Sequence, residues 1–360
     1  MFGWIRRFWH RHRTKLFVTG AVIGGAVLLG KYASWKLNEL REQEAVEYLS
    51  LTRRQHHFDS NQRTCNMTVL SMIPNLKEIL MQLLDSENLT AQLKNKPTNR
   101  VEIWEELKII SFTRTIVAVY SSCMLVVLLR IQLNIIGGYM YLDGMSSQDM
   151  FQSTDQKLPP EIQQRYLATI QYLLEQGLKD FITSVRSAVE AVLTCVSLKH
   201  CISTHEVTAM INKVRSLIET EKTEQFDSAH SLCKYMLPSE ATVMQENGII
   251  HQLMIETKDM LESDDCSNII NLCLKTGFNR LEDNIQQFYN PVDVTNENNL
   301  QYLNIPLAKI IPVMNGQIHS ICSDTPNHFV QELLLLQPVK DFAANIYEAF
   351  SQSASASIAP

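Results

Sequence analysis

The chain has 360 residues, of which 45% are hydrophobic and 19% charged, a composition typical of a globular protein and unlike that of a disordered one. Its net charge of -6 is unevenly spread: residues 1–36 hold seven Lys or Arg and no acid, so the remainder has 25 basic residues against 38 acidic ones. A body with an excess of acid is a poor nucleic-acid binder, and we expect no nucleic-acid partner.

A basic segment followed by an apolar one opens the chain. Its positive residues are Arg6, Arg7, Arg11, Arg13 and Lys15. The next fifteen residues, from Leu16 to Gly30, carry no charge, and Lys31 closes the run. A run of this length also fits a cleaved signal peptide, but no A-x-A cleavage motif follows, and the flanking lysines can extend a span by reaching back to the membrane surface. The pattern predicts a basic targeting segment over residues 1–15 and a retained transmembrane anchor over residues 16–32.

The first part of the body reads as a series of helices. Residues 32–58 contain interleaved charges and neither Gly nor Pro, which predicts a polar helix. Residues 64–85 are dense in Leu, Ile and Met, which predicts a buried helix that Pro74 either kinks or starts anew. A short amphipathic piece over residues 89–94 and a loop over residues 95–97 follow.

The stretch from Thr98 to Leu142 is the most apolar part of the body. Acidic residues in its first turns suit the positive end of a helix dipole, and no charge occurs from Thr115 to Leu129. Arg114 and Arg130 bracket this run, which is shorter than the roughly 20 residues that cross a bilayer. We predict a central core helix that ends at Gly137-Gly138, with a second membrane span as the alternative.

Trp104 does not fit the apolar face of this helix. At about 100° per residue it shares a row with Arg100, Lys108 and Ser111, so its indole is predicted on a polar face. Such a Trp is either an exposed anchor for a partner or the rim of its own core. The residues themselves leave both interpretations open.

The remainder alternates polar loops with helical patterns, and β-branched runs bounded by hairpin turns are nearly absent. We therefore predict an all-α fold, one large elongated helical bundle over residues 33–350 behind the anchor, with a flexible tail over residues 351–360. Two subdomains meeting near a loop at residues 143–158 are the alternative. The expected helices cover residues 160–199, 203–226, 240–261, 266–290, 306–322 and 326–350, and the second begins with a capping box from Ser203 to Glu206.

No catalytic motif is present. The sequence lacks HExxH, GxSxG and GxGxxG patterns, and no Cys or His spacing suits zinc. The neighbouring His200 and Cys201 are better explained as a helix-end cation and a core thiol than as a reactive pair. Eight scattered cysteines without a CxxC pair indicate free thiols in a reducing compartment. We expect no enzyme activity, cofactor or metal.

Several runs of residues resemble the vertebrate peroxin three family of peroxisomal biogenesis factors. The resemblance covers nearly the whole chain and weakens mainly in residues 145–158, 220–251 and 290–304. The runs that carry it are Asn61–Met72 (NQRTCNMTVLSM), Glu102–Thr113 (EIWEELKIISFT), Leu128–Gly138 (LLRIQLNIIGG), Leu307–Pro312 (LAKIIP) and Val339–Asn345 (VKDFAAN).

The resemblance implies a single-pass peroxisomal membrane protein whose body faces the cytosol. It implies a docking receptor for peroxin nineteen, the chaperone that carries new peroxisomal membrane proteins and whose N-terminal amphipathic helix occupies an apolar groove. The family's groove tryptophan matches Trp104, which favours the anchor interpretation. Leu93, Lys94, Ile103 and Leu107 are further groove candidates, placed by local match and helix geometry.

One implication conflicts with the residues. The basic segment would keep the N-terminus in the cytosol under the positive-inside rule, whereas the resemblance places it inside the organelle. We follow the resemblance, because insertion into peroxisomes need not read loop charge in the same way. Whether the body contacts lipid is left undecided by the sequence. The alternative function is that of a membrane-anchored lipid-binding or organelle-tethering helical protein, which would contain a closed apolar cavity.

Overall fold

The computed structural model describes residues 3–95, 97–146, 158–220, 230–238, 248–289 and 304–352. Side chains at residues 3–30, 33, 146, 220, 230 and 231 lie outside the description. The chain divides into two compact units, Met1–His57 and Phe58–Pro360. The second unit, called the body below, is one bundle, so the predicted all-α fold is confirmed and a division near residues 143–158 is not found.

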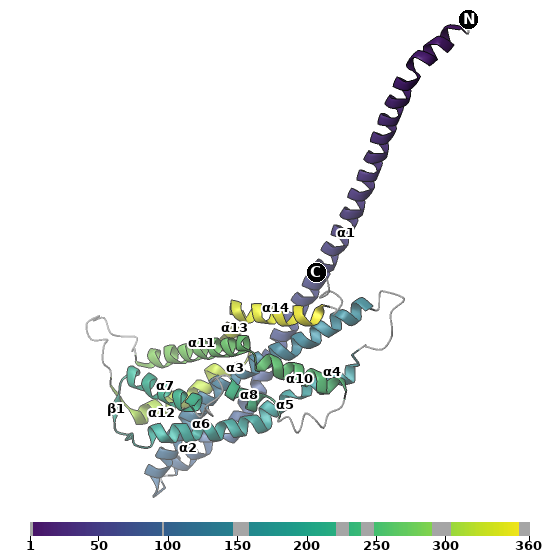
Figure 1. Cartoon of the computed structure of the whole chain (residues 1–360). Coiled ribbons are helices and arrows are strands. Elements are labelled where there is room, and N and C mark those ends of the chain that lie inside the picture. Colours follow the sequence, from purple (N-terminus) through teal and green to yellow (C-terminus); the bar gives the residue numbers. More distant parts are fainter. Residues whose placement is uncertain are drawn as a thin grey trace, which may run out of the picture. The chain divides into compact units, whose positions relative to one another are not determined.

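Fourteen helical segments occur in the described ranges, together with one pair of two-residue strands (Figure 1). The strands β1 (Cys201–Ile202) and β2 (Ile305–Pro306) are antiparallel, with Cys201 opposite Pro306 and Ile202 opposite Ile305. The helices are α1 Gly3–Leu83, α2 Ser86–Lys94, α3 Arg100–Ser146, α4 Pro160–Ala168, α5 Ile170–Tyr172, the π-helix η1 Leu173–Gly177, α6 Leu178–Leu193, α7 Thr204–Thr220, α8 His230–Met236, α10 Ile249–Leu261, α11 Asp264–Tyr289, α12 Leu307–Ile321, α13 His328–Leu335 and α14 Gln337–Ser351.

Helix α1 joins the segments that were expected as separate helices. Pro74 lies inside it and does not start a new helix, so that half of the expectation was wrong. Within the body, Ile73, Leu76 and Leu80 are fully buried at helical spacing, and their packing on the core holds the chain helical across the missing hydrogen bond of Pro74.

Helix α3 is the centre of the body. Residues 107–138 are all buried, and α6, α11, α12 and α14 pack against them (Figure 1). By length and apolarity α3 could cross a membrane, but its most apolar stretch is completely enclosed by the bundle. The prediction of a core helix is therefore confirmed over the alternative of a second span.

Gly137 and Gly138 do not end this helix, contrary to the prediction. A Cβ at Gly137 would lie 2.6 Å from Asn61 Nδ2, and one at Gly138 would lie 2.6 Å from the carbonyl carbon of Phe350. The two glycines thus let α1 and α14 approach the backbone of α3 closely. A Gly-Gly pair usually predicts the end of a helix, but here it allows close packing of neighbouring helices.

Three charged side chains of α3 are completely buried, namely Lys108, Arg114 and Arg130. Arg114 forms an ion pair with Glu87 of α2 at 2.9 Å and donates to Asn315 Oδ1 at 2.6 Å. Arg130 donates to Gln62 Oε1, to Asn66 Oδ1 and to the Leu334 carbonyl. Burial lowers the pKa of Arg130, whose hydrogen-bond partners in the described residues are all neutral.

The single helix expected over residues 160–199 was wrong, because the structure divides it into α4, α5, η1 and α6 and ends it at Leu193, whereas the remaining helices mostly follow the expected order with shifted ends. The capping box of α7 is confirmed, because Ser203 N donates to Glu206 Oε2 at 2.7 Å and Glu206 N donates to Ser203 Oγ at 3.3 Å. The helix expected over residues 326–350 is split at Leu336 into α13 and α14, and α8 was not expected. Residues 147–157 of the expected loop, 221–226 of the expected α7 region, 240–247 and most of the tail lie outside the described residues.

All eight cysteines are free thiols, as predicted. Cys195 and Cys201 are exposed, Cys233 is half-buried and the other five are buried. The expectation that Cys201 is a core thiol next to a helix end was therefore wrong, since it lies in β1, beyond the end of α6 at Leu193. Burial raises the pKa of Cys65 to about 11 and those of Cys233, Cys273 and Cys322 to about 12, and it also raises the pKa values of Cys123 and Cys266.

We predict two classes of thiol. In the native protein at neutral pH, Cys195 and Cys201 should react with a maleimide first, because the other six are covered and carry little thiolate. After denaturation under argon all eight should react. Mass spectrometry of the labelled chain gives both counts, and a pair that stays protected after denaturation would reveal a disulfide and refute the assignment.

We also predict that Arg130→Lys destabilises the body. Lys cannot reach Gln62, Asn66 and the Leu334 carbonyl together, so buried polar groups lose partners at a cost of about 2 to 3 kcal/mol. The Tm of the full chain in detergent should fall by roughly 4 to 10 °C. Arg186→Lys, at a half-exposed ion pair, is the matched control and should lower the Tm by at most a few degrees. Equal Tm values for both variants would contradict a structural role for Arg130.

Candidate partner-docking site

Trp104 lies where α3 emerges from the body. Residues 100–102 are exposed, Trp104 is half-buried, and every residue from Leu107 to Gly138 is buried. Val101, one turn before Trp104 on a flank of its row, is 69% exposed. The indole therefore stands at the rim of the core with part of its surface open to solvent.

The polar row predicted beneath Trp104 is not a solvent face. Lys108 and Ser111 are both completely buried, so this part of the helical-wheel prediction was wrong. Lys108 Nζ pairs with Glu105 at 2.5 Å and donates to the Val196 carbonyl at 2.9 Å, and Ser111 Oγ donates to the Leu107 carbonyl at 2.6 Å. Burial is possible because each polar group has a partner inside the body.

Helix α6 and the turn after it contact the residues that follow Trp104. Arg186 of α6 forms an ion pair with Glu106 at 2.7 Å, and Lys108 holds the carbonyl of Val196. These contacts neutralise Glu105 and Glu106, the two carboxylates that follow Trp104. The sequence could not predict the Arg186–Glu106 ion pair, because the two residues are 80 positions apart.

Helix α2 packs against α3 and brings two other predicted residues to this end of the body. Its first turn is fixed by the Arg114–Glu87 ion pair and by Asp85, whose side chain accepts from Asn88 N at 2.9 Å. Leu93 is half-buried, and Lys94 is exposed in the last turn of the helix.

Ile103 and Leu107 are less accessible than the other candidates. They are only 6% and 5% exposed, so they belong to the buried part of α3. Trp104, Leu93 and Lys94 are the candidates with surface that a partner could touch.

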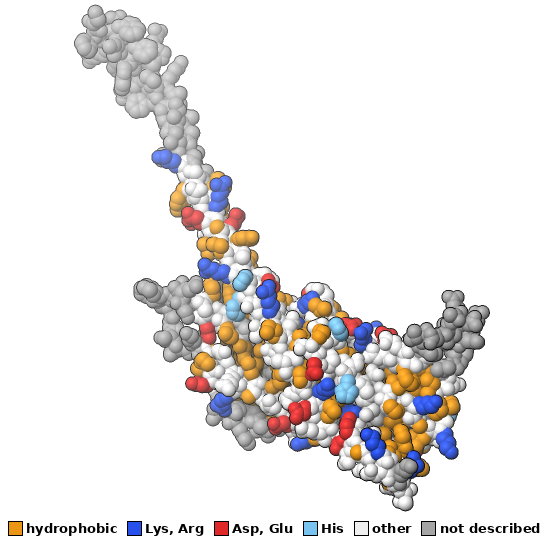
Figure 2. Space-filling model, turned by 180° about the vertical axis from the view of Figure 1, so that it is seen from behind, with side chains coloured by type: hydrophobic (Ala, Val, Ile, Leu, Met, Phe, Trp, Pro, Cys, Tyr) orange, Lys and Arg blue, Asp and Glu red, His pale blue; other side chains and the backbone are white. Residues whose placement is uncertain are grey.

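Outside the ion pairs, the exposed charged residues nearest Trp104 in the chain are two cations, Lys94 and Arg100, and one carboxylate, Glu102. Glu105 and Glu106 are paired, whereas Lys94 and Arg100 are exposed and form no ion pair within the described residues. Hydrophobic side chains gather, with Lys and Arg among them, at the end of the body that holds α2 (Figure 2). This surface suits an apolar helix face bordered by acidic residues.

The polar groups at this end of the body are few and are mostly paired or exposed. Among the described residues no group of three or more His, Cys, Asp or Glu could hold a metal ion. The described titratable groups beside Trp104 are either paired or exposed. The site consists of the half-buried Trp104, the helix α2 and the exposed cations Lys94 and Arg100.

Comparison with known proteins gives one consistent result. The family model described as Peroxin-3 matches residues 7–102 and 95–349. Peroxisomal biogenesis factor 3 of Mus musculus is 51% identical over 366 residues, which cover 96% of this chain and 98% of that protein. The Homo sapiens protein of the same name is 51% identical over 367 residues, with the same coverage.

A more distant relative, peroxisome biogenesis protein 3-2 of Arabidopsis thaliana, is 25% identical over 374 residues, 97% of this chain and 99% of that protein. The similarity therefore extends over whole chains and not over one shared domain. The chain belongs to the Peroxin-3 family of peroxisome biogenesis factors.

Proposed function

We propose that this chain is a docking receptor of the peroxisomal membrane that captures peroxin nineteen and so supports the insertion of peroxisomal membrane proteins. Membership of a family of peroxisome biogenesis factors supports a role in peroxisome biogenesis. The identity of the partner follows from the family resemblance. The body supplies a surface on which the partner's N-terminal amphipathic helix can lie.

The half-buried indole of Trp104 is the observation that carries this proposal. An aromatic side chain that is packed on one side and open on the other loses little conformational entropy when a partner covers it. Its chain neighbours Ile103 and Leu107 are buried, and Glu105 and Glu106 are fixed by ion pairs, so the turn of α3 that carries Trp104 is held in place. Such a preorganised Trp is the usual centre of a helix-binding groove.

The polar border of the surface favours one kind of helix. Lys94 on α2 and Arg100 on α3 are exposed and unpaired within the described residues. A partner helix with acidic residues beside its apolar stripe would meet these cations at the edge of the contact. Such border charges mainly accelerate association and select the orientation of the helix.

We further propose that residues 16–32 anchor the chain in the peroxisomal membrane, with residues 1–15 as the targeting segment and the body in the cytosol. Helix α1 includes this region, and about 20 helical residues span the hydrocarbon core. At its end Tyr32, and just beyond it Trp35, are 62% and 60% exposed, and their ring centroids lie 6.0 Å apart. Exposed Tyr and Trp next to Lys31 and Lys36 are typical of the membrane–water interface.

We predict that Trp104→Ala weakens binding much more than it lowers stability. Loss of a central aromatic anchor should cost about 2 to 4 kcal/mol of binding free energy, or roughly 30-fold to 1000-fold in Kd. Calorimetric titration of the full chain with the partner's N-terminal peptide measures this loss, and a thermal melt of the same sample measures stability.

Two variants serve as controls for this experiment. Phe288→Ala removes another aromatic side chain, 46% exposed on α11, and should bind normally. Phe181→Ala truncates a fully buried ring and should lower stability by about 3 to 5 kcal/mol. If Trp104→Ala binds normally, or melts like Phe181→Ala, the docking role is wrong.

For the anchor we predict that deleting residues 1–33 releases a folded, soluble body. The reason is that α3, the other helix apolar enough to span a bilayer in the described part of the chain, is enclosed by its neighbours. Alkaline extraction of membranes should leave the full chain in the pellet and the shortened chain in the supernatant. Retention of the shortened chain in the pellet would mean that a second segment is inserted.

A further inference from the structure

The last three turns of α1 have a second face that the core covers only in part, since Met81 packs against the core whereas Pro74, Glu78 and Gln82 are exposed. Ile73, Leu76, Leu80 and Leu84 point inward and are buried. A stripe next to this buried row is exposed or half-buried and recurs at intervals of three and one residues, which is one face of a helix. It consists of Pro74, Lys77, Glu78, Met81, Gln82 and Asp85.

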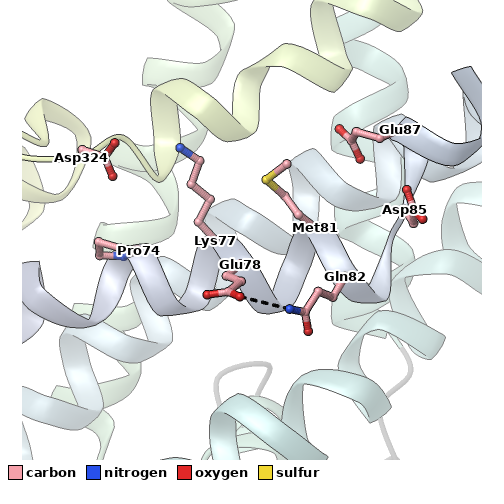
Figure 3. Close-up of a pocket in the computed structure, with 8 residues that line it drawn as sticks. All are labelled: Pro74, Lys77, Glu78, Met81, Gln82, Asp85, Glu87 and Asp324. Atoms are coloured by element: carbon pink, nitrogen blue, oxygen red, sulfur yellow. Dashed lines mark hydrogen bonds between the residues drawn. The ribbon is translucent and has the colours of Figure 1, made fainter. Parts of the chain in front are cut away.

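This stripe is the floor of an open groove of about 450 Å³. Glu87, in the first turn of α2, and Asp324, in the connection between α12 and α13, complete its lining. Figure 3 shows Lys77 and Met81 extending from α1, with Asp324 to one side and Glu87 to the other. The groove therefore has an apolar centre and charged borders.

The borders are mainly negative. Four of the lining residues are acidic and one is basic. Glu87 is neutralised by Arg114 and Asp85 caps α2, but Glu78, Asp324 and Lys77 form no ion pair within the described residues. An uncompensated negative border repels anionic lipid and nucleic acid and attracts a cationic partner.

The shape indicates which cationic partner fits. The stripe covers twelve residues from Pro74 to Asp85, which at about 1.5 Å per residue is roughly 16 Å or three turns. A second helix can lie along it with apolar residues against Pro74 and Met81 and basic residues beside Glu78 and Asp324. We propose that this groove binds a Lys- or Arg-bearing amphipathic helix of a partner protein.

This surface differs from the one around Trp104 in the sign of its charge. The Trp104 surface presents the unpaired cations Lys94 and Arg100 beside one exposed carboxylate, Glu102, whereas the α1 groove presents the unpaired carboxylates Glu78 and Asp324 beside one unpaired cation, Lys77. A helix that suits one surface is repelled by the border of the other. The α1 groove is therefore a second docking surface with its own partner, and it does not depend on the proposed capture of peroxin nineteen.

A designed peptide of about 18 residues tests the proposal directly. It is helical, with a narrow Leu stripe flanked by Lys, and carries a fluorophore whose anisotropy reports binding to the full chain in neutral detergent. Glu78→Lys/Asp324→Lys should weaken its binding about tenfold or more, because two attractive contacts become repulsive. Glu175→Lys/Asp283→Lys changes the net charge equally at exposed positions on η1 and α11, and should bind within about twofold of the unchanged chain.

Further variants make the result decisive. Glu78→Gln/Asp324→Asn keeps the side-chain size and should weaken peptide binding about threefold. This variant tests the role of the two carboxylates if the charge-reversed chain fails to fold. Trp104→Ala should leave binding unchanged. Equal weakening by both charge-reversed pairs, loss of binding in Trp104→Ala, or equal binding of a peptide with Glu in place of Lys would each overturn the proposal.

Discussion

The complete burial of α3 is the constraint on which the body depends. Its residues from Leu107 to Gly138 are all buried, so their polar groups need partners inside the bundle. Lys108 donates a hydrogen bond to the turn after α6, Arg114 to α2 and α12, and Arg130 to α1 and the end of α13. Each buried cation thus fixes the position of a different neighbour, and misplacing any of them would leave a buried charge without partners.

These same contacts shape the surface that we assign to the partner. The ion pair from Arg114 holds the first turn of α2, and Lys108 and Arg186 neutralise the carboxylates beside Trp104. The surface is therefore supported by helices that the core has already locked. Binding to such a rigid surface requires little ordering of the receptor, so most of the ordering cost falls on the partner's peptide.

Local sequence signals predicted the helices well where their causes were local. The capping box at Ser203 and the helix start at Pro160 depend on neighbouring residues and were found where expected. Gly137 and Gly138 were misread because their role depends on Asn61 and Phe350, which are distant in the sequence. The split between α13 and α14 was also missed, although Gln337-Pro338 stood at the break.

The site was less predictable than the fold. Trp104 could be singled out as the residue that breaks the apolar pattern, but the charges sharing its row were taken as a sign of exposure. Burial of Lys108 depends on the Val196 carbonyl, 88 residues away, and that contact has no sequence signature. The difference between Leu93 and Lys94, which reach the surface, and Ile103 and Leu107, which are buried, likewise required the packed structure.

Amide hydrogen exchange of the full chain in detergent, with and without the partner's N-terminal peptide, tests the central claim most directly. The claim is that α3 is a water-excluded core whose first turns end in a docking surface. We expect amides of residues 109–136 to exchange slowest in both states, and added protection on binding to be confined to the end of α2 and the first turns of α3. Fast exchange in the middle of α3, or protection that appears only elsewhere on the body, would contradict the account.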